Sequence, residues 1–135
     1  MAARLTPALA WKRRLYRMLG MRVGEHASVG FMVMMDIFFP GDITLGADCI
    51  IGYNTTILCH EFLRHEWRRG PVWIGPDVMI GANSTVLPGV VVGAGATVSA
   101  MSLVNRDVPP GAMVGGVPIR LLRPAGDRPA GVADA

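Results

Sequence analysis

The chain has 135 residues, a length that suits a single domain with one hydrophobic core. Hydrophobic residues make up 51% of it, but no uninterrupted apolar run is long enough to cross a bilayer, so the sequence predicts no integral membrane segment. Thirteen basic and ten acidic residues give a formal net charge of +3.

The positive charge is concentrated in the first 22 residues, which hold six basic residues and no acid, whereas the remainder holds seven basic and ten acidic residues. Within this arm Trp11, Leu15 and Met18 recur at helical spacing and predict the apolar stripe of a short amphipathic helix. No continuous apolar core precedes a small-residue cleavage site, so the arm does not read as a signal peptide. We expect the helix of arm 1–22 to cover an open end of the fold that follows.

The basic face of this arm allows a second interpretation, in which it binds a membrane surface or a nucleic acid. The covering role is the simpler one, because it needs no further partner. We therefore expect no nucleic-acid partner.

From residue 74 onward an aliphatic side chain returns at every sixth position. These positions are Ile74, Ile80, Val86, Val92, Val98 and Val104. A small or β-branched residue follows four places after each of them, at Val78, Ser84, Val90, Ala96, Ser102 and Val108. A period of six fits neither a helix nor a simple strand, so it predicts a chain that turns repeatedly and stacks on itself as a parallel β-helix.

The residue before each small position is of a type that tolerates positive φ at a tight corner. These corner residues are Asp77, Asn83, Gly89, Gly95 and Asp107. Met101 breaks the series, and a methionine at positive φ costs on the order of 1 kcal/mol.

The same rule extends towards the N-terminus, through Leu45, Ile51 and Ile57 and, more weakly, through Val23, Val29 and Met35. Since three hexapeptides make one coil, the sequence predicts about four coils. They are 23–40, 45–62, 74–91 and 92–109, separated by a short insert at 41–44 and a loop at 63–73. The fold class is therefore all-β, with a domain at 23–123 and an aperiodic, disordered tail at 124–135.

The longest interruption of the repeat, residues 60–73, carries two of the three histidines, three arginines and two tryptophans. Loops on a rigid repeat scaffold are a common place for functional residues. His60 lies where the stacked chain enters this loop, and imidazole is the usual general base near neutral pH. Trp67 and Phe62 could form a platform for a ring of a ligand or could anchor the loop, and Glu61 is a weaker candidate for a second acid.

The two cysteines, Cys49 and Cys59, have neither a metal-ligand spacing nor a disulfide framework, which predicts a reducing, cytoplasmic location. Cys59 precedes His60, but adjacent strand residues point to opposite faces. We therefore expect Cys59 to pack in the core or groove rather than act as a nucleophile.

Three runs of sequence carry a family resemblance: IGYNTTILCHEF, IGPDVMIGANSTVLPGVVVGAGATVSA and NRDVPPGAMVGGVPIRLLR. They resemble hexapeptide-repeat acetyltransferases of the maltose, galactoside and xenobiotic type, over residues 20–123, and the ending GGVPIR is the most specific part. The resemblance implies a left-handed β-helix, a homotrimer with active sites between neighbouring subunits, and direct transfer from acetyl-CoA to the hydroxyl of a small acceptor.

Matched position by position, the resemblance implies that His60 is the catalytic base and that the backbone amide of Ala82 stabilises the oxyanion. The matched positions for acetyl-CoA binding are Ala82, Ala100, Asn105, Arg106, Arg120 and Arg123. Arginines suit the phosphates of a coenzyme, and a small alanine leaves room for its pantetheine arm. For Arg120 and Arg123 the alternative is a solvated C-terminal segment.

Two positions depart from the pattern of the resembled family. Asp36 stands where many relatives have an asparagine that orients the histidine, and a carboxylate there would hold the imidazole tautomer. Met101 stands where the family usually has glycine, near the expected coenzyme groove.

Two other classes of function stay open at this point. His26, His60 and His65 provide three imidazoles, as a metal site of the γ-carbonic anhydrase type needs, although His65 lies outside the hexapeptide register. A noncatalytic β-helical scaffold or inactive paralogue is the other class. The sequence favours the acetyltransferase and predicts no metal site.

Overall fold

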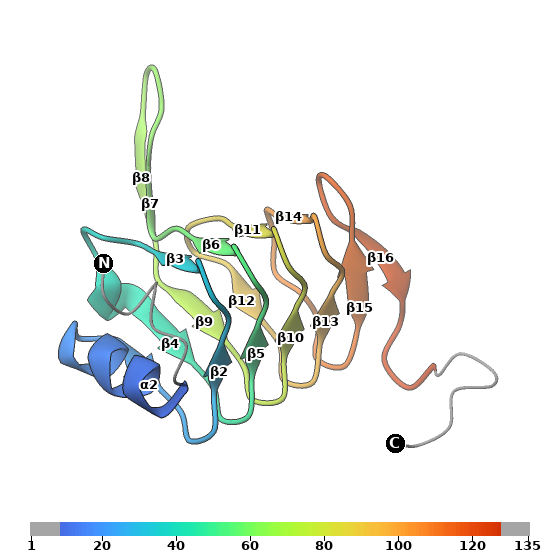
Figure 1. The fold of residues 1–135 in the computed structure, drawn as a ribbon. Coiled ribbons are helices and arrows are strands. Elements are labelled where there is room, and N and C mark those ends of the chain that lie inside the picture. Colours follow the sequence, from blue (N-terminus) through green and yellow to red (C-terminus); the bar gives the residue numbers. More distant parts are fainter. Residues whose placement is uncertain (1–8, 128–135) are drawn as a thin grey trace.

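The structure is a computed structural model, and it describes residues 9–127. One helix, α2 (Leu9–Met18), lies at one end of this part of the chain, and short strands stack side by side away from it (Figure 1). The predicted arm and tail extend beyond the described residues, at 1–8 and 128–135. No helix within residues 9–127 is long and apolar enough to span a membrane.

Three sheets of stacked strands form the body of the domain. Sheet A contains β1 (Arg22–Val23), β4 (Ile43–Leu45), β9 (Val72–Ile74) and β12 (Val91–Val92). Sheet B contains β2 (Ser28–Val29), β5 (Ile50–Ile51), β10 (Met79–Ile80), β13 (Thr97–Val98), β15 (Met113–Gly115) and β16 (Arg120–Arg123). Sheet C contains β3 (Met34–Met35), β6 (Thr56–Ile57), β11 (Thr85–Val86) and β14 (Leu103–Val104).

The chain passes through sheets A, B and C in this order and then repeats the order. All the pairings within these sheets are parallel except that of β15 with β16. Within sheet A, Ile74 pairs with both Leu45 and Val92, so every sixth-position residue stacks on its counterpart from another pass. The predicted mostly-β fold and its stacked rows are confirmed.

The inner rows form the hydrophobic core, because side chains at alternate strand positions point inward. Every aliphatic residue of the predicted period-six rows is buried, from Val23 to Val104. The small positions that follow them are buried as well, including the polar Thr55, Ser84 and Ser102.

Most predicted corners have the left-handed backbone conformation. Positive φ occurs at Asp48, Asn54, Asp77, Asn83, Gly89, Gly95 and Met101. Met101 has a φ of 62°, which confirms the strained corner predicted for it. Asp107 was predicted as a corner but does not have positive φ; its carboxylate instead accepts a hydrogen bond from the Val91 amide at 2.8 Å.

The repeat shortens after Val104, and the prediction of a sixth regular hexapeptide there is wrong. Val108 was predicted at a small corner position, but it forms a parallel bridge with Val92 and so takes the place of an inner-row residue. Val114 then pairs with Val98. The Asp107 carboxylate, which binds the Val91 amide, supplies a partner that a longer turn would have provided from the backbone.

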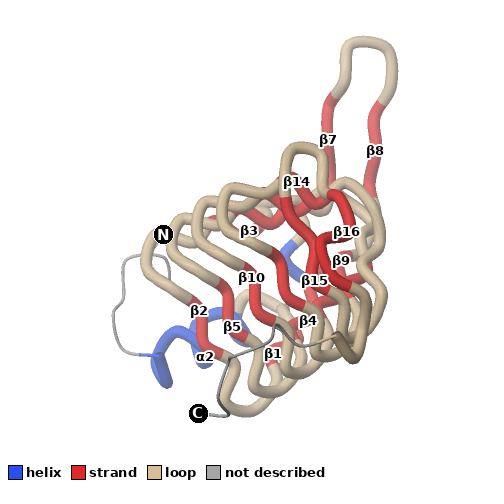
Figure 2. The backbone as a smooth tube through the Cα atoms, turned by 90° about the vertical axis from the view of Figure 1, so that its right-hand side faces the viewer, coloured by secondary structure: helices blue, strands red, loops and turns tan. Residues whose placement is uncertain are grey.

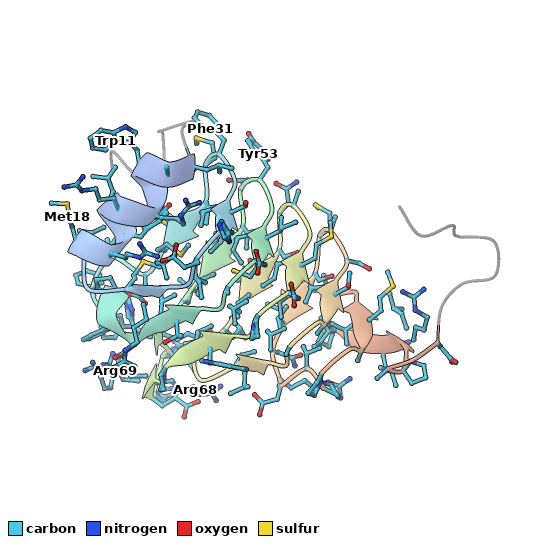
Figure 3. All side chains as sticks on the ribbon, turned by 90° about the horizontal axis from the view of Figure 1, so that it is seen from below. Trp11, Met18, Phe31, Tyr53, Arg68 and Arg69 are labelled. Carbon is cyan, nitrogen blue, oxygen red and sulfur yellow. The ribbon has the colours of Figure 1, made fainter. Side chains whose placement is uncertain are left out.

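Helix α2 lies against the first strands with a face that only partly matches the predicted one. Trp11 and Met18 are 60% and 76% exposed, and both point away from the strands (Figure 3). The buried residues of the helix are Lys12 and Tyr16. Of the predicted apolar stripe, only Leu15 packs against the core, where it is partly buried.

The orientation of α2 follows from the backbone of the first strands, whose outward carbonyls have no earlier strand to pair with. The Lys12 ammonium donates to the carbonyl oxygens of Val29 and Gly30, at 3.2 and 2.5 Å. The Arg17 guanidinium donates twice to the Val23 carbonyl, at 2.9 and 2.7 Å. The expectation that the helix covers an open end is met, but through its basic side chains.

The excursion predicted as a loop is a β-hairpin. Strand β7 (His60–Phe62) pairs in antiparallel fashion with β8 (Trp67–Arg69), and after two intervening residues the chain returns to sheet A. The hairpin projects from the stacked strands in two perpendicular views (Figures 1 and 2). The prediction of a loop at 63–73 is wrong, because this span contains β8, which pairs with β7, and the start of β9, which pairs with β4.

Candidate active site

His60 and Asp36 meet at one corner of the stack. Asp36 follows β3, His60 comes three residues after β6, and these two strands are paired with Met35 opposite Ile57. The pairing brings the two side chains together across 24 residues of sequence, and His60 Nδ1 lies 2.5 Å from Asp36 Oδ2. The side chain of Asp36 is fully buried, and that of His60 is 12% exposed.

The Asp36 carboxylate is held by a ring of backbone donors. Its Oδ1 accepts from the amides of Phe38 and Phe39, both at 2.9 Å, and its Oδ2 from those of Cys59 and His60, at 2.8 and 3.2 Å. Burial alone would raise the pKa of Asp36, but the hydrogen bonds from Phe39, Cys59, the His60 ring and Phe38 outweigh it, so the pKa lies below its usual value. The carboxylate is therefore ionised at neutral pH.

This contact fixes the protonation of the neutral imidazole. An ionised carboxylate can only accept hydrogen bonds, so the proton of neutral His60 lies on Nδ1 and the lone pair on Nε2. A carboxylate that orients an imidazole in this way also stabilises the imidazolium that forms when Nε2 takes a proton. The pair is thus equipped for general-base chemistry.

Aromatic rings surround the imidazole. The ring centroids of Phe38, Phe39 and Phe62 lie 5.2, 5.3 and 5.3 Å from that of His60, all in edge-to-face geometry. Trp67 in turn contacts Phe39 and Phe62. Phe38 and Phe62 are mostly exposed, so apolar surface borders the site. The sequence analysis identified Phe62 and Trp67 but missed Phe38 and Phe39, whose only signal was their proximity to Asp36 in the chain.

The neighbours of His60 in sequence are less suited to chemistry. Cys59 is fully buried, and burial raises the pKa of its thiol to about 12, so it stays protonated as expected for a packing residue. Glu61 pairs with Arg68 across the hairpin, and strand alternation directs its side chain to the opposite face from His60.

Ala82 and Ala100 occupy equivalent turns between sheets B and C, in successive passes of the chain. The Met101 amide donates to the Ala82 carbonyl at 2.9 Å, which stacks the two turns. A Cβ at Gly81 would lie 2.4 Å from the Ala100 amide, so only glycine fits there. His60 begins the hairpin strand β7, which follows β6 of sheet C and precedes β9 of sheet A, so one chain places it and the two alanines at different corners.

The remaining predicted coenzyme residues lie near the C-terminal end of the stack. Asn105 and Arg106 follow β14, are exposed, and one Arg106 nitrogen donates to the Ile119 carbonyl at 2.9 Å. Arg120 and Arg123 belong to β16, where they pair with Gly115 and Met113. Backbone pairing orders both residues, and Arg120 is exposed while Arg123 is partly buried.

The three histidines are not grouped as a metal site would need. His26 and His65 are both exposed, and His26 Nδ1 lies 3.6 Å from Asp48. Within residues 9–127 there is no cluster of three or more His, Cys, Asp or Glu side chains that could hold a metal ion.

The stacked rows of six define a class, the hexapeptide-repeat transferases. Residues 71–106 match the family described as bacterial transferase hexapeptide (six repeats). The chain is 58% identical over 121 residues to the "Putative acetyltransferase YvoF" of Bacillus subtilis (strain 168), a match that covers 89% of this chain and 70% of that protein. It is 33% identical over 93 residues to the galactoside O-acetyltransferase of Escherichia coli (strain K12), covering 64% and 46%.

Solved structures agree with these relatives. A hexapeptide-repeat acetyltransferase of Vibrio cholerae, VCA0836, complexed with acetyl-CoA, has a TM-score of 0.73 and 27% identity, and the match covers 93% of this chain and 82% of that one. A galactoside acetyltransferase in complex with coenzyme A shares the fold, with a TM-score of 0.70 at 24% identity and coverage of 90% and 74%. The chain belongs to the hexapeptide-repeat acetyltransferase family and is an acyltransferase.

Proposed function

We propose that this chain transfers an acetyl group from acetyl-CoA to a hydroxyl of a sugar-like or other small acceptor, with His60 as the general base. One observation carries the proposal: Nδ1 of His60 contacts the buried carboxylate of Asp36, which leaves Nε2 free to accept a proton. Acetyl-CoA as the donor is supported by the coenzyme in the related Vibrio cholerae structure.

In the proposed reaction Nε2 of His60 takes the proton of the acceptor hydroxyl as its oxygen attacks the thioester carbonyl. The C–S bond then breaks, and the coenzyme leaves as a thiolate that takes up the proton from the imidazolium. Asp36 stabilises the imidazolium and keeps the ring in the productive tautomer. The acetyl group is now an ester of the acceptor, and His60 has returned to its starting state.

The proposed oxyanion donor is the backbone amide of Ala82. Small side chains at Ala82 and Ala100 leave space along their row for the pantetheine arm. Asn105, Arg106, Arg120 and Arg123 are proposed to bind the rest of the coenzyme, with the arginines at its phosphates. Since the Arg106 guanidinium also donates to the Ile119 carbonyl, it joins the coenzyme surface to the C-terminal segment.

We further propose that the stacked passes form a left-handed β-helix of about four coils, with its domain at 23–123, and that three copies assemble. Within one chain His60 and the alanine row lie at different corners, so a site containing both is completed by a neighbouring copy. A closed three-fold ring repeats this contact three times. We expect the trimer to act in the cytoplasm.

The experiment that tests the reaction is coenzyme A release in the presence of a panel of hydroxyl and amine acceptors. His60→Ala should lower transfer at least about a hundredfold, the scale of general-base catalysis. His65→Ala, on the exposed tip of the hairpin, is the matched control and should keep the rate. An unchanged rate in His60→Ala would remove the base assignment, and transfer confined to amines would refute the hydroxyl acceptor.

The shared site has its own test in mixed trimers. Chains carrying His60→Ala are combined with chains whose coenzyme surface is blocked by Ala100→Trp. Mixing should restore activity, because some sites then combine an intact His60 with an intact coenzyme surface. A fully active monomer by light scattering would contradict the trimer.

A further inference from the structure

An ion pair closes the base of the hairpin beside His60. Arg69 is the cross-strand partner of His60, so both side chains lie on one face of the hairpin. Arg69 Nε donates to Asp42 Oδ2 at 2.8 Å, and a second guanidinium nitrogen donates to Oδ1 at 3.4 Å. This two-point contact fixes the plane of the guanidinium relative to the turn that carries Asp42.

Phe39 lies between this ion pair and the imidazole. The central guanidinium carbon of Arg69 lies 3.8 Å from the Phe39 ring centroid, and that centroid lies 5.3 Å from the His60 ring at an interplanar angle of 77°. Phe39 therefore contacts both the guanidinium and the imidazole. A cation over an aromatic face and an edge-to-face ring pair are both attractive, so Arg69 holds Phe39 in place and Phe39 in turn holds the imidazole.

The turn that carries Phe39 also holds the other side of the imidazole. Asp36 accepts from the Phe39 amide at 2.9 Å, and the Asp42 amide donates to the Phe39 carbonyl at 3.0 Å. One seven-residue segment, 36–42, thus binds His60 through Asp36 and Arg69 through Asp42. A single hydrogen bond at Nδ1 fixes one atom of the ring and leaves its plane free to rock, so Phe39 supplies the second restraint.

We propose that Arg69 and Asp42 are positioning residues that press Phe39 against His60 and so fix the plane of the imidazole, aiming Nε2 at the acceptor hydroxyl. This inference rests on the proposed role of His60 as the base. It adds that the ion pair at the foot of the hairpin, together with Asp36, sets the direction in which Nε2 of His60 points.

The solvent exposure of the Arg69–Asp42 pair indicates that it contributes to the position of His60 and little to the stability of the fold. The side chains of Arg69 and Asp42 are 44% and 24% exposed, and an exposed ion pair contributes little to folding. Misplacing a catalytic group by a fraction of a bond length, in contrast, costs a large share of the rate. The effect of breaking the pair should therefore appear in turnover and not in thermal unfolding.

The test compares Arg69→Met with Arg68→Met. Arg68 is the neighbouring residue on the same strand, pairs with Glu66, and points to the opposite face, so its variant is a matched control. Arg69→Met should lower kcat about tenfold while KM for acetyl-CoA changes less than about twofold. Arg68→Met should keep both within about twofold of the parent. Equal kcat in the two variants would overturn the proposal.

A second readout does not depend on activity. Nitrogen-15 NMR of the imidazoles reports the tautomer of each histidine, and the chain has only three, so the exposed His26 and His65 act as internal references. His60 should keep its proton on Nδ1 in both proteins, because Asp36 is unchanged, but its ring signals should shift and broaden in Arg69→Met as the ring plane becomes free to rock. Unchanged His60 signals would refute the clamp even if kcat falls.

The ring itself is tested by Phe39→Leu and Phe39→Tyr. The leucine variant loses the aromatic ring and should reproduce the kcat and NMR changes of Arg69→Met, whereas the tyrosine variant keeps the ring and should behave as the parent. Loss of kcat in both variants, or in neither, would contradict the role of the Phe39 ring between Arg69 and His60. If the parent transfers acetyl to no acceptor, the proposed function fails, and the NMR comparison alone then decides whether the clamp exists.

Discussion

Lys12 and Asp36 are both charged and both buried, but the protein treats the two charges differently. The Lys12 ammonium has two carbonyl acceptors at the open end of the stack, and burial lowers its pKa. The Asp36 carboxylate receives four backbone amides and an imidazole, and these keep it ionised although burial opposes this. The two groups thus differ in their number of partners: Lys12 has two and caps backbone carbonyls, whereas Asp36 has five and orients the imidazole of His60.

The largest expected effect on stability comes from removing Asp36. Asp36→Ala leaves four backbone amides, that of Cys59 buried and the other three partly buried, without their acceptor, and we expect the free energy of unfolding to fall by about 3–5 kcal/mol. Urea unfolding followed by circular dichroism measures this loss. Asp48→Asn, which removes an exposed charge and keeps a residue type that tolerates the positive φ of this corner, is the control and should change stability by less than about 1 kcal/mol. A loss as small as the control would mean that the amides find other partners.

The corresponding change at the other end is Lys12→Met, which keeps the length of the side chain and removes its charge. Two carbonyls lose their donor, but the cost of burying an ammonium disappears as well, so we expect a smaller loss of about 1–2 kcal/mol. Arg14→Met on the exposed face of α2 serves as the reference in the same urea measurement. A Lys12 variant more stable than the parent would show that burying the charge costs more than its hydrogen bonds return.

The pH dependence of stability should distinguish the two charges, because the charge of Asp36 stabilises the folded state whereas the charge of Lys12 destabilises it. The pKa of Asp36 is lower when folded, so its contribution is present above its unfolded pKa, near 3.9, and is lost as pH falls through the folded value. The pKa of Lys12 is also lower when folded, so burial of its charge costs stability at neutral pH, and this cost is relieved as pH rises through the folded value.

Urea midpoints at a series of pH values measure both effects. Relative to the parent, Asp36→Asn should lose the acid-side dependence and Lys12→Met the alkaline-side gain. If either variant keeps the full dependence of the parent, another group is responsible for it.

The smallest expected effect concerns Met101, a strained corner that involves no charge at all. Met101→Gly removes the strain of a positive φ but adds freedom to the unfolded chain, so the gain in unfolding free energy should be at most about 1 kcal/mol. Thermal unfolding measures the gain, and Ala100→Gly at the preceding position is the control. A destabilised Met101→Gly variant would show that the methionine side chain makes compensating contacts.

The inner rows could be predicted from sequence because each position, such as Ile74 or Ile80, must be aliphatic in every pass of the chain. Asp36 could be identified as well, since a carboxylate in a largely apolar run stands out. The contact of Phe39 with His60 could not, because the insert after Pro40 breaks the period of six and hides which residues face each other. The helix α2 could be predicted, but burial of its ends could not, because burial was assigned by hydropathy whereas the carbonyls of Val29 and Gly30 bind Lys12.

The turn after β15 has a consequence for how this molecule behaves at high concentration. A parallel stack can in principle add further strands at its last edge without limit, which is the growth mode of fibres. Here β16 runs antiparallel along β15, and in the turn that joins them Gly116 accepts from the Leu103 amide and the Ile119 amide donates to the Leu103 carbonyl. The fold therefore blocks the addition of further strands at both ends of the stack: α2 covers the first edge, and this return segment covers the last.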